Sequence, residues 1–359
     1  MVPNEGGGMR KMTVSRRGFM KMGLGALGGL ALNRGPAGRA SGLRTGLPHV
    51  PASPQLFTKI TSTSRVSLVK GEDRHRNITQ ALKALESDIL SSIGNKKILL
   101  KPNVVLADNP LAVTHVDSVR AILDFLAPHV KRPIIIGEGG HHKTWDGYRN
   151  AGYLGLEKNY NVQLVDLNLG PYEYRYVFGV EHNPLPVRIS STCLDPDVYI
   201  ISAAQMKTHN YVLVTLSLKN LLLGCPIKDN KSNDKGLFHT ASPAVNDLCH
   251  FNMFHIAQDV FPDLAVIDGF EAMEGNGPAW GTALPARVAL ASLDALAADT
   301  LATKIMGFDP KRVLYLASMN EAGMGQGDLD KILVSGTPLD QCLCHFRAHE
   351  KMAEVYGLK

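Results

Sequence analysis

Short apolar runs alternate with amphipathic stretches along most of the chain, and this alternation predicts its secondary structure. Runs of four to six mainly apolar residues, typical of strands, occupy residues 65–70, 97–101, 133–137, 162–166, 187–190, 198–202, 264–269 and 287–291. Apolar residues at helical spacing predict helices over residues 77–92, 116–129, 211–223, 243–260 and 294–306. This order of elements favours an α/β fold with a largely parallel sheet and flanking helices, either in one body or as two α/β lobes around a cleft.

Charge is distributed unevenly along the chain. The 359 residues include 38 Lys and Arg against 33 Asp and Glu, which gives a net charge of +5. Residues 1–40 hold seven basic residues and one acidic residue, so the remaining chain has a net charge of −1. A body of that charge has no net field with which to hold a polyanion, and we therefore expect no nucleic acid partner.

The first 40 residues have the order of an export signal. A basic stretch precedes an apolar run of 11 residues, 22–32, which is too short to cross the ~30 Å core of a bilayer. We therefore expect no transmembrane segment, and cleavage near Ala40. The segment from Ser15 to Lys21 contains Arg16 and Arg17 and resembles twin-arginine signals. That resemblance implies export by the twin-arginine translocation machinery to the periplasm or another extracytoplasmic space; a basic disordered tail and an uncleaved anchor are the alternatives.

Composition divides the rest of the chain into three parts. Residues 41–64, rich in Pro, Ser, Thr and Gly, are predicted to be a linker, 65–336 the α/β domain and 337–359 a C-terminal tail. The five cysteines include no Cys-x-x-Cys pair, so we expect no iron–sulfur cluster held by this chain alone. Cys342 and Cys344 are interpreted as incidental thiols, with a metal or redox site as the alternative.

Polar residues follow several predicted strands, at the edge where open α/β sheets bind ligands. The clearest signal is Lys219 beside Asn220 in an apolar stretch, because a buried ammonium needs an anionic partner. The alternative is a lysine that reaches solvent or pairs with a core carboxylate. The residues predicted to bind a small anionic substrate or a phosphorylated cofactor are Lys101, Asn103, Glu138, Asn220, Lys235 and Asn276. Those predicted to act in catalysis are Lys207, His209, Lys219, His239, Asp268 and Glu274.

The glycine-rich loop after residue 268 carries the acidic part of this prediction. Asp268 and Glu274 could accept a proton or hold a hard cation, whereas Asp and Gly residues also form ordinary turns. The spacing is not that of an EF-hand, so calcium is not specifically indicated. The sequence also contains no P-loop, no Gly-x-Gly-x-x-Gly between a strand and a helix, no Gly-x-Ser-x-Gly and no His-Glu-x-x-His. Those absences argue against nucleotide folds, serine hydrolases and zincins of the familiar kinds.

Seven motifs in this order resemble the domain of unknown function 362 family over roughly residues 65–336. The motifs are Lys101-Pro-Asn103, Gly137-Glu-Gly, Lys207-Thr-His209, Thr215-x-x-x-Lys219-Asn220, Lys235 with His239, the loop from Asp268 to Pro278, and Asp294 with Asp299. Many members look like iron–sulfur proteins with an appended ferredoxin-like module, and such a module is not found in this sequence. The family is also distantly similar to lactate racemases, which hold a nickel-pincer nucleotide through lysine and histidine. This similarity implies a transition metal or a metal-bearing nucleotide as a candidate cofactor.

Two functions of different classes follow from these features. The first is an exported α/β enzyme that binds a small anionic substrate or phosphorylated cofactor among the lysines and histidines. The second is a non-catalytic periplasmic binding protein, or an iron–sulfur or redox accessory protein that works with a redox partner. A third interpretation treats the lysines as structural ion pairs.

Overall fold

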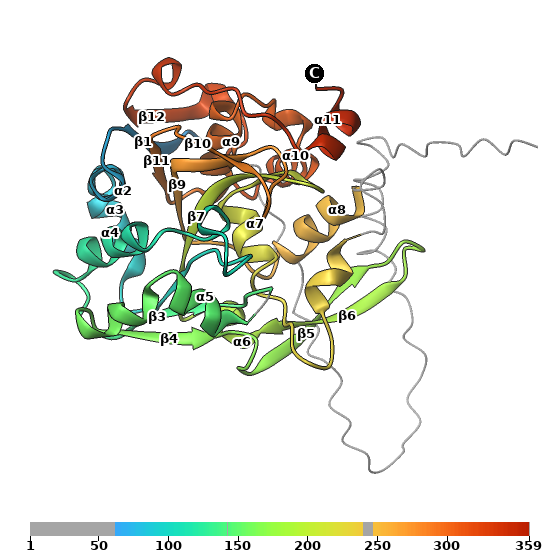
Figure 1. Ribbon diagram of the computed structural model, residues 1–359, viewed down its shortest axis with the longest axis horizontal. Coiled ribbons are helices and arrows are strands. Elements are labelled where there is room, and N and C mark those ends of the chain that lie inside the picture. The colour runs from blue at the N-terminus through green and yellow to red at the C-terminus, as the bar shows by residue number, and fades with distance from the viewer. Residues whose placement is uncertain (1–61, 142, 240–246, 359) are drawn as a thin grey trace, which may run out of the picture. The chain divides into compact units, whose positions relative to one another are not determined.

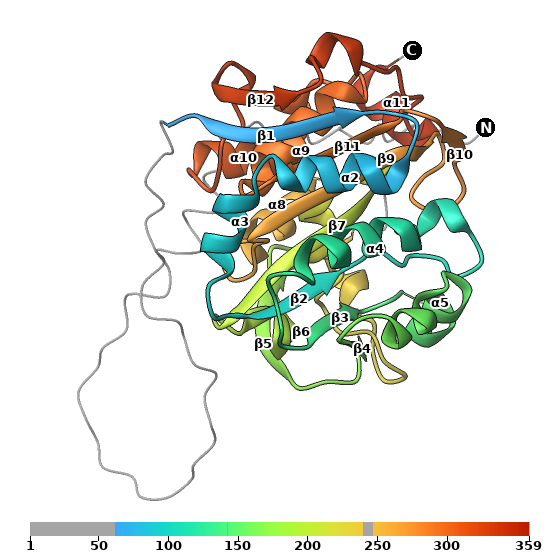
Figure 2. The same cartoon turned by 90° about the vertical axis from the view of Figure 1, so that its left-hand side faces the viewer.

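The computed structural model describes residues 62–141, 143–239 and 247–358. One ten-stranded sheet runs through these residues, with helices on both faces (Figures 1 and 2). The α/β fold predicted from the sequence is therefore confirmed, and it forms around one sheet rather than two lobes. The predicted leader, almost all of the predicted linker and residues 240–246 lie outside the described residues.

Most neighbouring strands in the main sheet are parallel. Its members are β1 (Ser64–Lys70), β2 (Lys97–Lys101), β3 (Ile134–Glu138), β4 (Val162–Asp166), β7 (Val198–His209), β8 (Leu213–Thr215), β9 (Leu264–Glu274), β10 (Thr282–Leu284), β11 (Val288–Ser292) and β12 (Ile332–Gly336). The order across the sheet is β12-β1-β11-β9-β7-β2-β3-β4, with β10 paired to β9 and β8 to β7. The strands from β9 to β4 form a parallel block, while β11 is antiparallel to both of its neighbours. The carboxyl ends of the parallel strands therefore share one edge.

Alternate residues of the central strands face opposite sides of the sheet, and each side has its own apolar core. In β7, Val198 and Ile200 pack in one core, while Tyr199 and Ile201 pack in the other. Over the second core, in front of the sheet in Figure 2, lie α2 (Arg74–Lys83), α3 (Glu86–Ile93) and α4 (Val116–Leu126), with α5 (Thr144–Asn150) beside them. Over the first core lie α7 (Ser217–Leu222), α8 (Asp247–Ile256), α9 (Ala295–Ile305), α10 (Leu314–Glu321) and α11 (Glu350–Tyr356). Short turns complete the helices: α6 (Ser191–Leu194), η1 (Pro110–Ala112), η2 (Tyr153–Lys158), η3 (Asp234–Phe238), η5 (Pro310–Arg312), η6 (Leu329–Lys331) and η7 (Leu339–Gln341).

Two predicted helices differ from the structure. The stretch 77–92 forms two helices, α2 and α3, because the chain turns at Leu85, whose N–H bonds the carbonyl of Leu82. The stretch 211–223 forms the strand β8 and only then the helix α7. Its apolar spacing fits a helix, but Thr215 pairs with Lys207, because β7 continues well beyond residue 202. A distant partner strand has overridden the local periodicity.

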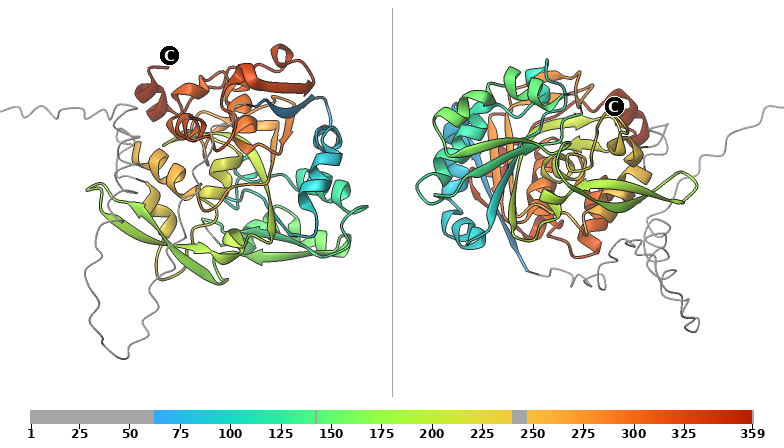
Figure 3. Two further views of the ribbon diagram at one scale, coloured as in Figure 1. Left: turned by 180° about the vertical axis from the view of Figure 1, so that it is seen from behind. Right: turned by 90° about the horizontal axis from the view of Figure 1, so that it is seen from below.

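Two further segments go beyond the prediction: strand β5 (Tyr172–Phe178), which pairs with the predicted strand at 187–190, and the chain after residue 336. Strands β5 and β6 (Pro184–Ser190) form a separate antiparallel hairpin, which projects from the body in Figure 3. Residues 337–358, which the sequence marked as a tail, contribute buried Cys342 and Met352 to the first core. No helix in the described part of the chain combines the length and the apolar composition needed to cross a membrane.

Candidate functional site

Four buried lysines gather near the carboxyl edge of the parallel strands. Lys101 is the last residue of β2, and Lys207 lies near the end of β7. Lys219 lies in α7, which packs on β7, and Lys235 lies in η3. None of the four side chains is more than 8% exposed. Lysine is almost never buried without a partner, so the partners of each ammonium decide what this cluster does.

Lys101 has a full set of partners. Its Nζ lies 2.7 Å from Oε2 of Glu138, the last residue of β3, and also donates to Asn220 Oδ1 at 3.0 Å and to the Pro102 carbonyl at 2.9 Å. Three acceptors match the three N–H groups of the ammonium. Burial raises the pKa of Glu138, and the Lys101 charge opposes that shift. This ion pair connects the lysine cluster to strand β3.

Two asparagines connect Lys101 to Lys207. Asn220 Oδ1 accepts from Lys101 and also from Asn103 Nδ2, at 3.0 Å in each case. Asn103 Oδ1 in turn accepts from Lys207 Nζ, which also donates to the Ala112 carbonyl at 3.0 Å. One N–H of Lys207 remains without a partner among the described residues, and no carboxylate there neutralises its charge. Burial and the Lys219 charge hold the pKa of Lys207 well below its ordinary value.

Backbone carbonyls hold Lys235. Its Nζ donates to Gly224 O at 2.9 Å, to Leu223 O at 3.3 Å and to Pro226 O. Burial lowers the pKa of Lys235 to about 8, and nearby Glu138 partly offsets the effect. All three of its donors are therefore engaged within the chain.

Lys219 is different from the other three. Its side chain is 8% exposed, yet among the described residues its ammonium makes no hydrogen bond and no ion pair. Burial lowers its pKa to about 8, with a further reduction from Lys101. Glu138 is thus the one buried carboxylate paired with any of the four lysines in the described ranges. The cluster carries an excess of positive charge that an anion would neutralise.

Two histidines beside Lys219 have defined tautomers. His209 Nδ1 accepts from the N–H of Tyr211 at 3.0 Å and of Val212 at 3.3 Å, so the neutral ring carries its proton on Nε2. His239 Nδ1 lies 3.2 Å from the Lys235 carbonyl, which requires a proton on Nδ1 and leaves Nε2 as an acceptor. Burial lowers the pKa of both rings, that of His239 to about 4, and the Lys219 charge adds to both shifts. The ring centres lie 6.3 Å apart, so a donor and an acceptor stand close together.

The structure places the predicted acidic residues with other partners. Asp268 Oδ2 accepts from Ser118 Oγ at 2.5 Å and lies 3.1 Å from Arg74 Nε. Glu274 Oε2 accepts from the backbone N–H of Arg347 at 2.8 Å. Asn276 is exposed. No hydrogen bond or ion pair in the described part of the chain joins these three residues to a lysine of the cluster, so the site consists of the lysines, Glu138, the asparagines and the histidines.

Asp299 supports the site although the sequence assigned it no role. From α9, it accepts the N–H of Ser217 at 2.9 Å and the N–H of Leu218 at 3.0 Å, and so caps the first turn of α7. That turn fixes the position of Lys219. Burial raises the pKa of Asp299 to about 7. A carboxylate inside an apolar helix, between Ala298 and Thr300, was the available signal.

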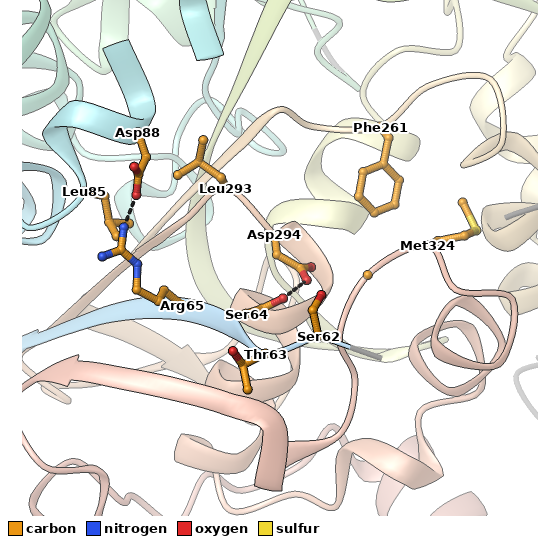
Figure 4. A pocket seen from close by; sticks show the side chains of 11 residues that line it. Ser62, Thr63, Ser64, Arg65, Leu85, Asp88, Phe261, Leu293, Asp294 and Met324 are labelled. Carbon is orange, nitrogen blue, oxygen red and sulfur yellow. Dashed lines mark hydrogen bonds and ion pairs between the residues drawn. The ribbon is translucent and has the colours of Figure 1, made fainter. Parts of the chain in front are cut away.

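The hollow that the structure shows lies away from the lysine cluster. Within the described ranges, no three His, Cys, Asp or Glu side chains are grouped so that they could hold a metal ion. A hollow of about 570 Å³ lies elsewhere, around the start of β1 (Figure 4). There Ser64 Oγ donates to Asp294 at 2.6 Å, and Arg65 pairs with Asp88. None of the predicted site residues lines this hollow.

The fold and the site together define an α/β protein with a cationic cluster buried at the carboxyl edge of its sheet. The chain belongs to the family described as Domain of unknown function (DUF362), whose model matches residues 98–304. This range includes all four lysines, both histidines and Asp299. The family resemblance carried by the sequence motifs is therefore confirmed.

Three known proteins are similar to this chain. The thylakoid-associated protein sll1697 of Synechocystis sp. is 27% identical over 232 residues, which cover 64% of this chain and 68% of that protein. The lactate racemase apoprotein of Thermoanaerobacterium thermosaccharolyticum superposes with a TM-score of 0.44 and 11% identity, over 69% of this chain and 58% of that chain. A Thermotoga maritima protein gives a TM-score of 0.39 and 14% identity, over 57% and 52%. This chain spans little more than half of either solved structure, and neither likeness bears on its activity.

Proposed function

We propose that the protein is an enzyme that binds a small anionic ligand at the lysine cluster and transfers a proton to or from it. The observation that carries this proposal is Lys219, a buried lysine whose ammonium has no partner among the described residues. An uncompensated buried charge is costly, and a carboxylate or phosphate group would neutralise it and accept its hydrogen bonds. The family match is consistent with such a site but names no activity.

The free donors suit a ligand with more than one negative oxygen. Counting partners among the described residues, Lys101 and Lys235 have no N–H left, whereas Lys219 has three and Lys207 has one. His209 adds the N–H of its Nε2. Four lysines against one carboxylate favour a dianion over a monoanion, because the second charge of the ligand is also compensated.

His239 supplies the chemistry in this proposal. Its neutral ring presents the Nε2 lone pair as the proton acceptor, and its low pKa means that this ring is unprotonated at neutral pH before the anion binds. Lys219, with a pKa of about 8, carries the proton for most of the population at pH 7 and can donate it. In this proposal, His239 as the proton acceptor and Lys219 as the proton donor both contact the same bound anion.

The binding test uses calorimetry on the full chain with inorganic phosphate, malonate and acetate. We expect phosphate or malonate to bind, Lys219→Met to weaken that binding at least tenfold, and the exposed control Lys231→Met to leave it unchanged. Equal binding by the wild type and Lys219→Met, or no binding of any of the three anions, would overturn the proposal.

The proton-transfer step has its own test. Malonate has acidic C–H groups, and in deuterium oxide we expect the protein to accelerate their exchange and His239→Ala to abolish the acceleration while retaining malonate binding. Tight malonate binding without accelerated exchange would favour the non-catalytic binding protein instead. Co-purification of a colourless protein with a cysteine-rich partner would favour the redox accessory.

We extend the proposal to location, on the sequence alone. The segment around Arg16 and Arg17 supports twin-arginine export to the periplasm, with cleavage near Ala40. The measurement is the N-terminal sequence and the location of the protein expressed in a bacterium, beside a variant with Arg16→Lys and Arg17→Lys. Retention of an intact N-terminus in the cytoplasm by the wild type would refute export.

A further inference from the structure

The hairpin of β5 and β6 has one face inside the core and one face outside it. Val177, Val187 and Ile189 are buried in the first core. On the opposite face Tyr172, Tyr174 and Tyr176 alternate along β5 and are between 43% and 49% exposed. Figure 3 shows the hairpin projecting from the body at its far end. Three half-exposed aromatic rings in a row mark an interaction surface rather than isolated surface residues.

The outer edge of β5 is not paired with another strand among the described residues, and the Tyr174 carbonyl on this edge accepts from Nη1 of Arg175 at 2.9 Å. Among the described strands, β5 pairs with β6 alone. At the Phe178 end of this edge, the Asn252 side chain takes the place of a partner strand. Its Oδ1 accepts from the Phe178 N–H at 2.8 Å, and its Nδ2 donates to the Phe178 carbonyl at 3.0 Å. The backbone of Phe178 therefore points away from β6, and by the period of two so does that of Tyr176 and Tyr174. Such an edge is a template for another strand.

The sequence of β5 is complementary to itself. Glu173 and Arg175 flank Tyr174 symmetrically. If two copies of β5 pair antiparallel about Tyr174, Glu173 of each copy faces Arg175 of the other, and Tyr172 faces Tyr176. Centring the pair on Glu173 or on Arg175 instead would set like charges opposite each other, which is unfavourable. One register therefore satisfies both the charges and the aromatic rings.

We propose that the protein forms a twofold dimer in which β5 pairs antiparallel with β5 of a second copy, centred on Tyr174. The two hairpins then make one four-stranded sheet, in the order β6-β5-β5-β6. Arg175 lies 3.3 Å from Asp259, which holds its guanidinium near the edge, and 3.1 Å from Glu173 of its own strand. In the dimer, the Arg175 guanidinium leaves Glu173 and the Tyr174 carbonyl of its own strand and pairs with Glu173 of the other copy, so that the Tyr174 carbonyl can accept from the backbone of that copy. The dimer proposal does not rest on the proposed anion binding at the lysine cluster.

Cysteine cross-linking tests the register. Opposite residues of a hydrogen-bonded antiparallel pair have Cα atoms about 5.5 Å apart, which a disulfide can bridge. Tyr174→Cys places a cysteine on the twofold axis, so oxidation should link two chains. In Tyr176→Cys, the matched control, the two cysteines lie about 14 Å apart from a rise of ~3.4 Å per residue and should not link. A mixture of Tyr172→Cys and Tyr176→Cys chains should link as a heterodimer.

The same proposal is tested without mutation by sedimentation equilibrium of the full chain. We expect a monomer–dimer equilibrium that Glu173→Arg weakens at least tenfold and that Glu173→Arg with Arg175→Glu restores to within threefold. Circular dichroism checks that each variant is folded. A wild-type monomer at all concentrations, or equal linking of the Tyr174→Cys and Tyr176→Cys variants above the background of the parent chain, would overturn the proposal.

Discussion

Replacing Lys219 by methionine should stabilise the protein in the absence of any ligand. The pKa of Lys219 is lowered from its ordinary value of 10.5 to about 8, and at 1.36 kcal/mol per pKa unit this corresponds to about 3 kcal/mol. Unfolded Lys219 binds its proton below pH 10.5, whereas the folded protein binds it only below about 8. The charge therefore reduces stability as pH falls from 10.5 to 8, and the full cost is present at pH 7. Methionine keeps most of the buried stem and removes that cost.

The assay is urea denaturation of the ligand-free protein at pH 7 and at pH 10. Lys219→Met should raise the free energy of unfolding by up to about 3 kcal/mol at pH 7, and the gain should shrink towards pH 10. Lys231→Met, an exposed lysine of the loop before η3, is the control and should change stability by less than about 0.5 kcal/mol. If Lys219→Met destabilises the protein at pH 7, the ammonium has a partner that compensates it, and the argument for an anion site is wrong.

Three more outcomes follow from the same contacts. Glu138→Gln should have the opposite sign to Lys219→Met and lower the free energy of unfolding by about 3 kcal/mol, measured by urea denaturation, because the Lys101 ammonium loses its one ionic partner. Anion affinity should fall about tenfold per pH unit above pH 8, because Lys219 of the ligand-free protein loses its proton there. Calorimetry in two buffers at pH 8 should detect proton uptake on binding. An affinity that does not change with pH would exclude Lys219 as the anion's partner. Asp299→Asn should leave the Leu218 N–H without an acceptor, so hydrogen exchange at that amide should accelerate and anion binding should weaken, while protection unchanged from the wild type would show that α7 does not depend on this cap.

The fold was largely predictable because its signals are local. Eight predicted strands fall on described strands, and the polar residues at their ends mark the right edge of the sheet. Lys219 could be recognised as unusual because charged residues rarely interrupt an apolar stretch. The helix predicted over residues 211–223 was wrong at its start because the pairing of β8 with β7 depends on residues outside that stretch.

The partners of the lysines could not be predicted, because each is distant in sequence. Lys101 meets Glu138 from the next strand of the sheet, and Lys207 meets Asn103, which lies 104 residues earlier in the chain. No periodicity shows which lysine receives the single carboxylate and which receives none. Asp299 shows the same limit, since its effect on α7 appears only when α9 packs beside that helix.

The contact between Arg188 and Asp234 connects the hairpin to the segment η3 of the lysine cluster. This contact explains why the hairpin, although peripheral, is anchored to the body. Arg188 of β6 donates from its backbone N–H to Asp234 Oδ2 at 2.7 Å and from its guanidinium to the same carboxylate at 3.0 Å. Asp234 is the first residue of η3, which carries Lys235 and is followed by His239. The ring of Tyr172, on the exposed face of β5, lies 5.3 Å from the Arg188 guanidinium. The strand that we propose to pair with a second copy therefore packs on the residue that fixes η3, and this contact gives the dimer surface and the anion site a common element.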